Sequence, residues 1–142
     1  MLYIAYGSNM DVDQMDYRCP HAAFVGTAVL RGWRLMFKGS KSGNYATIER
    51  ERGCKVPVVI WDIDQLDEFY LDRYEGYPSF YYKTEIYVPG RGWAMAYIMH
   101  EDRLLGAPTQ HYYGVLDKAY QRFWFDRTIL RDALAYSKKK PA

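Results

Sequence analysis

The stretch Leu2-Tyr3-Ile4-Ala5-Tyr6-Gly7-Ser8-Asn9 opens the sequence and changes character at its glycine. The residues before the glycine are apolar and favour β-structure, and glycine allows the backbone to turn sharply. We therefore expect a buried strand that ends in a turn. A short helix should follow, capped by Asn9 or Asp11 and ending before Pro20.

Beyond this turn, strand-like segments alternate with turn signals and two helical regions. One helix is expected from its cap Asp64 to Gly76, with Leu66, Phe69, Tyr70 and Tyr74 on one face, and residues from 109 onward are helical by composition and periodicity. Strands are expected at residues 22–38 (one or two bent strands), 45–49, 56–63, 81–88 and 93–100, with a loop at 38–44 and a hairpin turn at 89–92. This order predicts one α+β domain over residues 1–142, with a mainly antiparallel, barrel-like sheet.

Composition narrows the class of protein. The 142 residues suit one domain with one core, and no apolar run approaches the roughly 20 residues that span a bilayer, so we expect no membrane partner. The first residues carry no basic leader, which favours a cytoplasmic protein. A net charge of +2 is too weak to predict nucleic-acid binding. The 15 tyrosines suit a polar pocket, because tyrosine combines an apolar ring with a hydrogen-bonding tip.

Cysteine and histidine are too sparse and too scattered to predict a metal site. Cys19 and Cys54 favour free thiols, with one bridge between them left open, and the three histidines show no ligand spacing. Cys19 beside His21 is better interpreted as an ordinary loop than as an activated nucleophile. No nucleotide-binding glycine motif occurs, so no cofactor is expected.

The first candidate site is Tyr6-Gly7-Ser8-Asn9. A glycine turn after a buried strand points successive N–H groups at one spot, which binds a carboxylate or a developing oxyanion. The alternative is a plain strand-to-helix turn in which Ser8 or Asn9 only caps the helix. Ser8 as a hydrolase nucleophile is weaker, because the second glycine of a nucleophile elbow is missing.

The second candidate is Glu75 within Leu71-Asp72-Arg73-Tyr74-Glu75-Gly76-Tyr77-Pro78. The negative, C-terminal end of the helix dipole and burial among aromatic rings both disfavour ionisation of Glu75. Both effects would raise its pKa toward the range useful for general acid/base catalysis. The alternative is an exposed glutamate in front of a helix stop.

Taken together, these segments resemble the γ-glutamylcyclotransferase family, which includes the γ-glutamylamine cyclotransferases and AIG2-like proteins. Residues 3–10 are similar to its strand with Tyr-Gly-Ser, residues 71–77 to the segment holding its catalytic glutamate, and residues 108–112 to its proline-to-tyrosine segment. Residues 46–48, 56–61 and 93–99 resemble its core strands. The stretch from Gly114 to the aromatic run Phe123-Trp124-Phe125 departs from the strict γ-glutamylcyclotransferases, which leaves the departing amine open.

The resemblance implies a small mixed, mainly antiparallel β-barrel with peripheral helices and no cofactor or metal. It implies a cyclotransferase that releases 5-oxoproline from a small-molecule γ-glutamyl amide, with Glu75 as general acid/base. It also implies a substrate-binding set comprising Tyr3, Ile4, Ala5, Tyr6, Gly7, Ser8, Asn9 and Tyr112. A monomer or a homodimer is expected.

Three other functions stay open. The same site could act on a different γ-glutamylated biosynthetic intermediate, or the chain could be a non-catalytic small-molecule-binding module that keeps the pocket. A single-stranded nucleic-acid binder that stacks bases on Arg31-Gly32-Trp33-Arg34 is disfavoured by the near-neutral charge.

Overall fold

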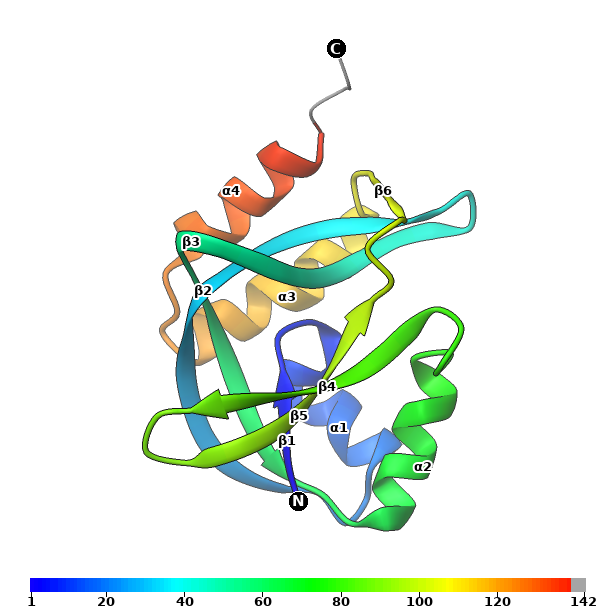
Figure 1. Ribbon diagram of the computed structural model, residues 1–142, viewed down its shortest axis with the longest axis vertical. Coiled ribbons are helices and arrows are strands. Elements are labelled where there is room, and N and C mark those ends of the chain that lie inside the picture. Colours follow the sequence, from blue (N-terminus) through cyan, green and yellow to red (C-terminus); the bar gives the residue numbers. More distant parts are fainter. Residues whose placement is uncertain (139–142) are drawn as a thin grey trace.

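The computed structural model describes residues 1–138 and shows a curled six-stranded sheet, a half-barrel, with helices packed around it (Figure 1). The last four residues of the predicted 1–142 domain lie outside the described residues. The elements, in chain order, are β1 (Leu2–Ala5), the 3-10 helix η1 (Ser8–Met10), α1 (Val12–Arg18), β2 (Ala23–Ser40), β3 (Gly43–Asp62), α2 (Gln65–Tyr74), β4 (Tyr81–Val88), β5 (Gly92–Met99), β6 (Leu104–Leu105), α3 (Gln110–Arg122) and α4 (Arg127–Ser137).

The short first strand lies in the middle of the sheet, whose order is β4-β5-β1-β3-β2-β6. Tyr3 pairs with Trp61 of β3 in antiparallel fashion and with Met95 of β5 in parallel fashion. The pairings of β2 with β3, β2 with β6 and β4 with β5 are antiparallel. The predicted α+β class with a mixed, mainly antiparallel sheet is confirmed, with β1 among the central strands of the curled sheet (Figure 1).

The long β2–β3 hairpin corrects two expectations. The predicted loop at 38–44 is a two-residue turn, Lys41 and Ser42, and the strands predicted at 45–49 and 56–63 are one continuous strand. Residues 50–53 and 55 are exposed, and the register with β2 is irregular between Arg31 and Trp33, so no alternation of buried and exposed residues marks the strand here. The β2 segment is one strand, bent at irregularities near Gly26 and Gly32.

Helix ends follow their predicted caps. The side chain of Asp11 accepts the Gln14 N–H at 3.2 Å to begin α1, and Asp64 forms a reciprocal capping box with Asp67 to begin α2. Gly76, with φ of +63°, follows the end of α2 as expected for a helix stop. The predicted helical C-terminal region is confirmed as α3 and α4, with Thr109 as the cap of α3.

The apolar face expected on α2 points away from the core. Phe69 and Tyr74 are about half exposed, at 52% and 45%, whereas Leu71 and the capping Asp67 are buried. This helix is therefore anchored by Leu71 and by its capped first turn. No helix among residues 1–138 is long and apolar enough to cross a membrane.

Candidate active site

A pocket of about 370 Å³ lies where β1 ends, beside the C-terminal end of α2 and the first turn of α3. It gathers most of the predicted site residues: Tyr3, Ile4, Tyr6, Gly7, Ser8, Asn9, Glu75 and Tyr112. Ala5 is buried and is not among the lining residues. Seven of the 15 tyrosines, here called the pocket tyrosines, form much of the wall: Tyr3, Tyr6, Tyr45, Tyr74, Tyr81, Tyr97 and Tyr112.

Glu75 is the C-cap residue directly after α2. Its N–H donates to the Leu71 carbonyl at 2.8 Å, and Gly76 then turns the chain away. Within the described residues, its carboxylate has no hydrogen-bond or ion-pair partner. The residue keeps partial access to solvent because it lines an open pocket, but protein atoms surround its carboxyl group. Burial raises the pKa of this carboxyl group to about 8, against an opposing effect of the Arg18 guanidinium. Such a group is able to accept and return protons near neutral pH.

Three of the pocket tyrosines have already committed their hydroxyl protons. Tyr6 donates to the Tyr97 carbonyl, Tyr81 donates to the Ala46 carbonyl at 2.8 Å, and the Tyr97 hydroxyl donates to Asp72 at 2.6 Å. A hydroxyl has a single proton to donate. These three residues therefore fix the shape of the wall.

Two other pocket tyrosines accept a hydrogen bond from an amide and keep their own protons free. Asn9 Nδ2 donates to the Tyr3 oxygen at 2.9 Å, and the Ala46 N–H donates to the Tyr112 oxygen at 3.1 Å. Burial raises the pKa of both hydroxyls well above the ordinary value, so both stay protonated. Tyr3 and Tyr112 are thus two hydroxyls that the wall leaves ready to donate into the pocket.

The turn at Gly7 brings backbone close to this pocket. A side-chain carbon at Gly7 would lie 3.2 Å from the Tyr112 hydroxyl oxygen, so glycine keeps that space open. Within the described part of the chain, the N–H groups of Gly7 and Ser8 have no acceptor. The Ser8 hydroxyl lies 3.1 Å from the Tyr74 hydroxyl oxygen and accepts from Arg18 Nη1 at 3.4 Å. Among the described residues, no general base lies within hydrogen-bond distance to take its proton and make it a nucleophile.

Sequence reasoning missed several residues of this site. Tyr81 and Tyr97 lie on predicted strands, and strand alternation could have placed them on one face but not at the pocket. Arg18 lies behind the turn at the end of α1 and bears no recognisable motif. Only the folded chain shows which of many aromatic and basic side chains meet Glu75.

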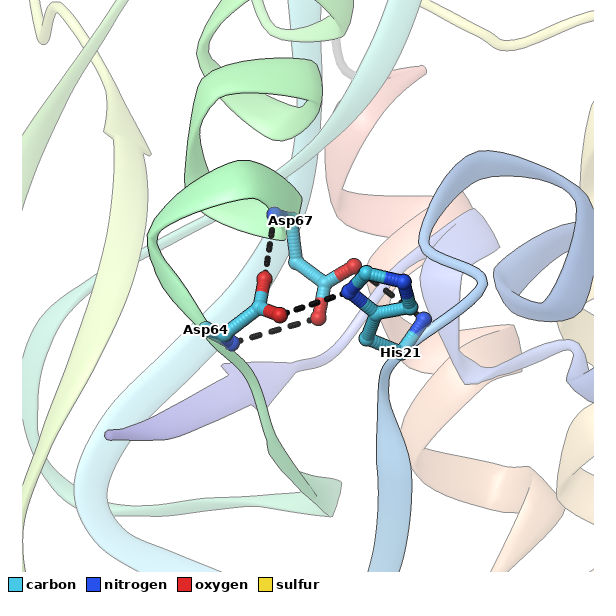
Figure 2. Close-up of side chains that lie close together, drawn as sticks. All are labelled: His21, Asp64 and Asp67. Carbon is cyan, nitrogen blue, oxygen red and sulfur yellow. Dashed lines mark hydrogen bonds and ion pairs between the residues drawn. The ribbon is translucent and has the colours of Figure 1, made fainter.

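A second polar cluster, His21, Asp64 and Asp67, joins the start of α2 to the loop after α1 (Figure 2). His21 Nδ1 lies 2.7 Å from Asp64 Oδ2, and Asp67 accepts the N–H groups of Asp64 at 3.2 Å and His21 at 3.4 Å. These carboxylate oxygens are engaged in capping and in holding the loop. The cluster therefore has a structural role: it holds the loop after α1 against the start of α2.

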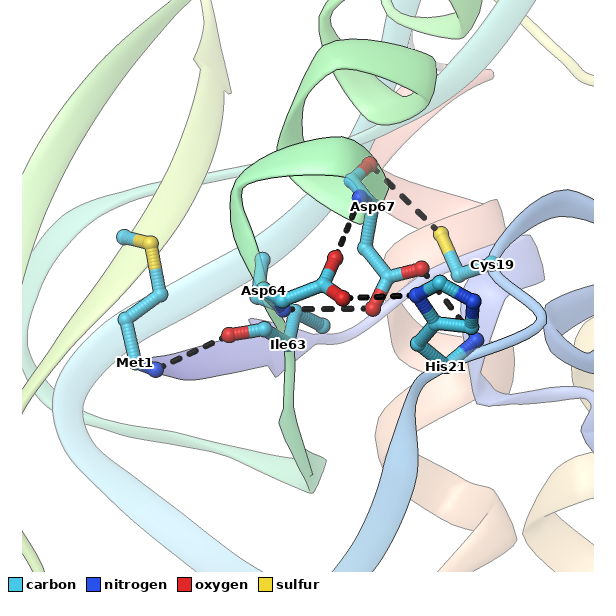
Figure 3. A network of polar contacts seen from close by, with 6 residues as sticks. All are labelled: Met1, Cys19, His21, Ile63, Asp64 and Asp67. Atoms are coloured by element: carbon cyan, nitrogen blue, oxygen red, sulfur yellow. Dashed lines mark hydrogen bonds and ion pairs between the residues drawn. The ribbon is translucent and has the colours of Figure 1, made fainter.

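Cys19 lies beside the same cluster, as Figure 3 shows. Its thiol lies 3.7 Å from the Asp67 carbonyl oxygen, and burial raises the pKa of the thiol to about 12. A thiol held protonated is a poor nucleophile. Cys19 and Cys54 are both free, so the bridge between them that the sequence left open does not form. The Met1 amine donates to the Ile63 carbonyl at 2.9 Å nearby and holds the first strand beside α2.

Two curated relatives of this chain are γ-glutamylcyclotransferases. Human γ-glutamylcyclotransferase is 35% identical over 85 residues, which cover 55% of this chain and 45% of the human protein. The bovine γ-glutamylcyclotransferase is 35% identical over 95 residues, covering 62% and 48% of the two chains. The chain thus spans about half the length of the curated relatives it matches.

Solved structures share the fold. A structure described as a γ-glutamyl cyclotransferase superposes with a TM-score of 0.82 at 24% identity, covering 100% of this chain and 89% of that chain. An uncharacterized protein from Homo sapiens superposes with a TM-score of 0.81 at 25% identity, covering 99% and 88%. The family model described as "Gamma-glutamyl cyclotransferase, AIG2-like" matches residues 3–122. Because that match spans most of the chain, including the turn at Gly7 and Glu75, the protein belongs to the AIG2-like γ-glutamyl cyclotransferase family.

Proposed function

We propose that this protein is a cyclotransferase that releases 5-oxoproline from a γ-glutamyl amide, with Glu75 as general acid/base. The observation that carries the proposal is the unpaired Glu75 carboxylate in a pocket, where burial raises its pKa to about 8. The membership of this protein in the γ-glutamyl cyclotransferase family supports the same reaction.

The reaction needs only proton transfers and one well-held substrate. The α-amine nitrogen attacks the γ-carbonyl carbon, a ring C–N bond forms, and the bond to the departing amine breaks. The attacking nitrogen begins with three protons as an ammonium and ends with one in the lactam, while the departing nitrogen gains two. Glu75 accepts each proton from the attacking nitrogen and returns it to the departing nitrogen. Ring closure is intramolecular, so a fixed substrate conformation supplies much of the rate.

Binding is assigned to the other groups of the pocket. The free N–H groups of Gly7 and Ser8 hold the substrate carboxylate or the oxyanion that develops on the γ-carbonyl. The free protons of Tyr3 and Tyr112 add two donors, and Ile4, Tyr6 and Asn9 shape the wall. Exposed lining residues such as Ser42 and Arg73 mark the mouth, where the departing amine would leave.

The test compares wild type with Glu75→Gln, using Glu51→Gln, an exposed glutamate of β3, as matched control. Release of 5-oxoproline is measured with γ-glutamyl amino acids, γ-glutamyl amines and ε-(γ-glutamyl)lysine. Wild type and the control should turn over at least one class, and Glu75→Gln should lose turnover while 5-oxoproline still raises its melting temperature. Wild-type turnover retained in Glu75→Gln would remove Glu75 from the mechanism. Stabilisation by 5-oxoproline with no turnover by wild type would favour the binding-module alternative.

A further inference from the structure

Arg18 connects three elements behind the pocket. It is the last residue of α1, and its Nη1 donates to Asn9 Oδ1 and, at 3.4 Å, to the Ser8 hydroxyl of η1. Its guanidinium carbon lies 3.5 Å from the centre of the Tyr74 ring at the end of α2. Arg18 does not line the pocket itself, so any effect on substrate must pass through these neighbours.

The contact with Arg18 decides which way the Asn9 amide points. A guanidinium has donors only, so it requires the amide oxygen of Asn9 and not its NH₂ group. The NH₂ group is then turned toward Tyr3, where Nδ2 donates to the hydroxyl oxygen at 2.9 Å. Asn9 is buried, and its backbone carbonyl accepts from Trp61 Nε1 at 2.9 Å, so the backbone that carries this side chain is held in place.

The direction of the Tyr3 proton follows from the direction of the Asn9 amide. Because the Tyr3 oxygen accepts from Asn9, its own proton must go to another acceptor, and the pocket lies on that side. If the amide were reversed, the amide oxygen would face Tyr3 and take the hydroxyl proton away from the pocket. A single surface-side arginine thereby selects one of two hydrogen-bond arrangements in the buried wall.

We propose that Arg18 is a positioning residue for the reaction: through Asn9 it makes the Tyr3 hydroxyl a donor to the substrate, and through Ser8 and Tyr74 it holds the Gly7 turn against the end of α2. This inference rests on the proposed function. It assigns a role to a residue outside the pocket.

Arg18 also acts electrostatically on the acid/base. Its positive charge favours the ionised form of Glu75 and so keeps the carboxyl pKa lower than burial alone would set it. The other titratable groups around Glu75 are the pocket tyrosines, several of them held neutral by burial, and Arg73, which is exposed to solvent at the mouth. Arg18 is therefore the cation that most directly tunes this carboxyl group.

The test uses Arg18→Met, which removes the charge and all donors, and Arg18→Lys, which keeps the charge. Arg34→Met is the matched control, because Arg34 stacks on the Tyr136 ring at 3.7 Å away from the pocket. The Glu75 carboxyl pKa is measured directly by ¹³C NMR in the free protein. It should rise in Arg18→Met, stay near the wild-type value in Arg18→Lys, and stay unchanged in Arg34→Met.

Kinetics then separates positioning from charge. The limiting kcat/KM, taken from the plateau of the pH profile, should fall about tenfold or more in Arg18→Met and recover in part in Arg18→Lys. The loss in the double variant Arg18→Met/Tyr3→Phe should be clearly smaller than the sum of the two single losses, because both changes remove the Tyr3 donor and only the role of Arg18 at the Gly7 turn adds to it. If Arg18→Met does not fold by circular dichroism, Arg18→Gln takes its place in both measurements.

The outcomes are distinguishable from failure of the proposed function. A wild-type protein that releases no 5-oxoproline would overturn the proposed function and this inference with it. Active wild type with an Arg18→Met plateau equal to that of wild type, or with fully additive losses in the double variant, would overturn the inference alone.

Discussion

The hydroxyl oxygen of Tyr112 accepts a hydrogen bond from the backbone N–H of Ala46 at 3.1 Å, so α3 and the β2–β3 hairpin meet at one atom of the pocket wall. The same oxygen is the nearest heavy atom to the space beside Gly7. Tyr112 thus has a structural role on one side of its oxygen and, in the proposed reaction, a donor role on the other.

Replacement Tyr112→Phe should remove both roles. We expect kcat/KM to fall by about 10²-fold, the usual cost of losing one donor to a developing oxyanion. The Ala46 N–H would also lose its partner, which should lower the free energy of unfolding by about 1–3 kcal/mol. Tyr113→Phe is the control, because the Tyr113 ring packs near Phe37 and its hydroxyl has no hydrogen-bond partner among the described residues. Equal kinetics for the two variants would exclude Tyr112 as a donor.

The pH profile of the reaction should show the Glu75 titration. Because the carboxylate form accepts the first proton and burial raises the pKa of this group to about 8, kcat/KM should rise with pH and level off above that value. The profile is measured with one γ-glutamyl amide in buffers of constant ionic strength. A rise of kcat/KM with an apparent pKa near the ordinary carboxyl pKa would show that a different or differently placed group controls the rate.

Protein stability should depend on the same group with the opposite sign. The folded pKa of about 8 lies above the ordinary value of 4.5, so between these values the folded state binds more protons than the unfolded state. The stability contributed by protonated Glu75 is therefore complete below about pH 4.5 and is lost as pH rises through about 8.

Glu75→Gln removes this titration. Denaturant unfolding at pH 5 and pH 9 should show wild type losing free energy of unfolding relative to the variant, on the order of a few kcal/mol. A difference between the two proteins that is independent of pH would show that Glu75 is not desolvated in solution.

Gly7→Ala should close part of the binding space. The added carbon would lie 3.2 Å from the Tyr112 oxygen and 3.4 Å from the Ala46 side chain, so it would fill space that the substrate carboxylate needs. We expect KM to rise several-fold with a smaller change in kcat. Gly114→Ala in α3 is the control, because nothing lies within 4 Å of its added carbon. It should be neutral or stabilising by about 0.5–1 kcal/mol. An unchanged KM in Gly7→Ala would place the substrate elsewhere.

Local signals predicted the element ends well. Asp11 and Asp64 cap helices, Gly76 ends one, and the turn at 89–92 joins two strands, because each of these depends on only a few neighbouring residues. The β2–β3 ribbon was harder. Residues 50–55 include Gly53 and Cys54 among charged side chains, and their register against β2 is irregular between Arg31 and Trp33, so no local signal indicated that β3 continues through them.

The candidate site divides in the same way. Glu75 and the Gly7 turn were proposed from local chemistry and from the family resemblance, and the fold brings them to one pocket. The partners of these groups could not be predicted, because Tyr81 and Tyr97 come from strands placed by the sheet order and Arg18 from a helix whose packing against the end of α2 no local pattern indicates. Side-chain alternation gives a face of a strand but not the strand beside it.

The central position of β1 has a consequence for how the protein is made. The strand is synthesised before both of its neighbours, β3 and β5, so its pairing on both edges must wait until β5 has been made. Such distant contacts slow folding. The Gly7 turn extends from this strand, and ligand binding should therefore report the last step of folding, because a partly folded chain contains the proposed site residues but does not bring them together.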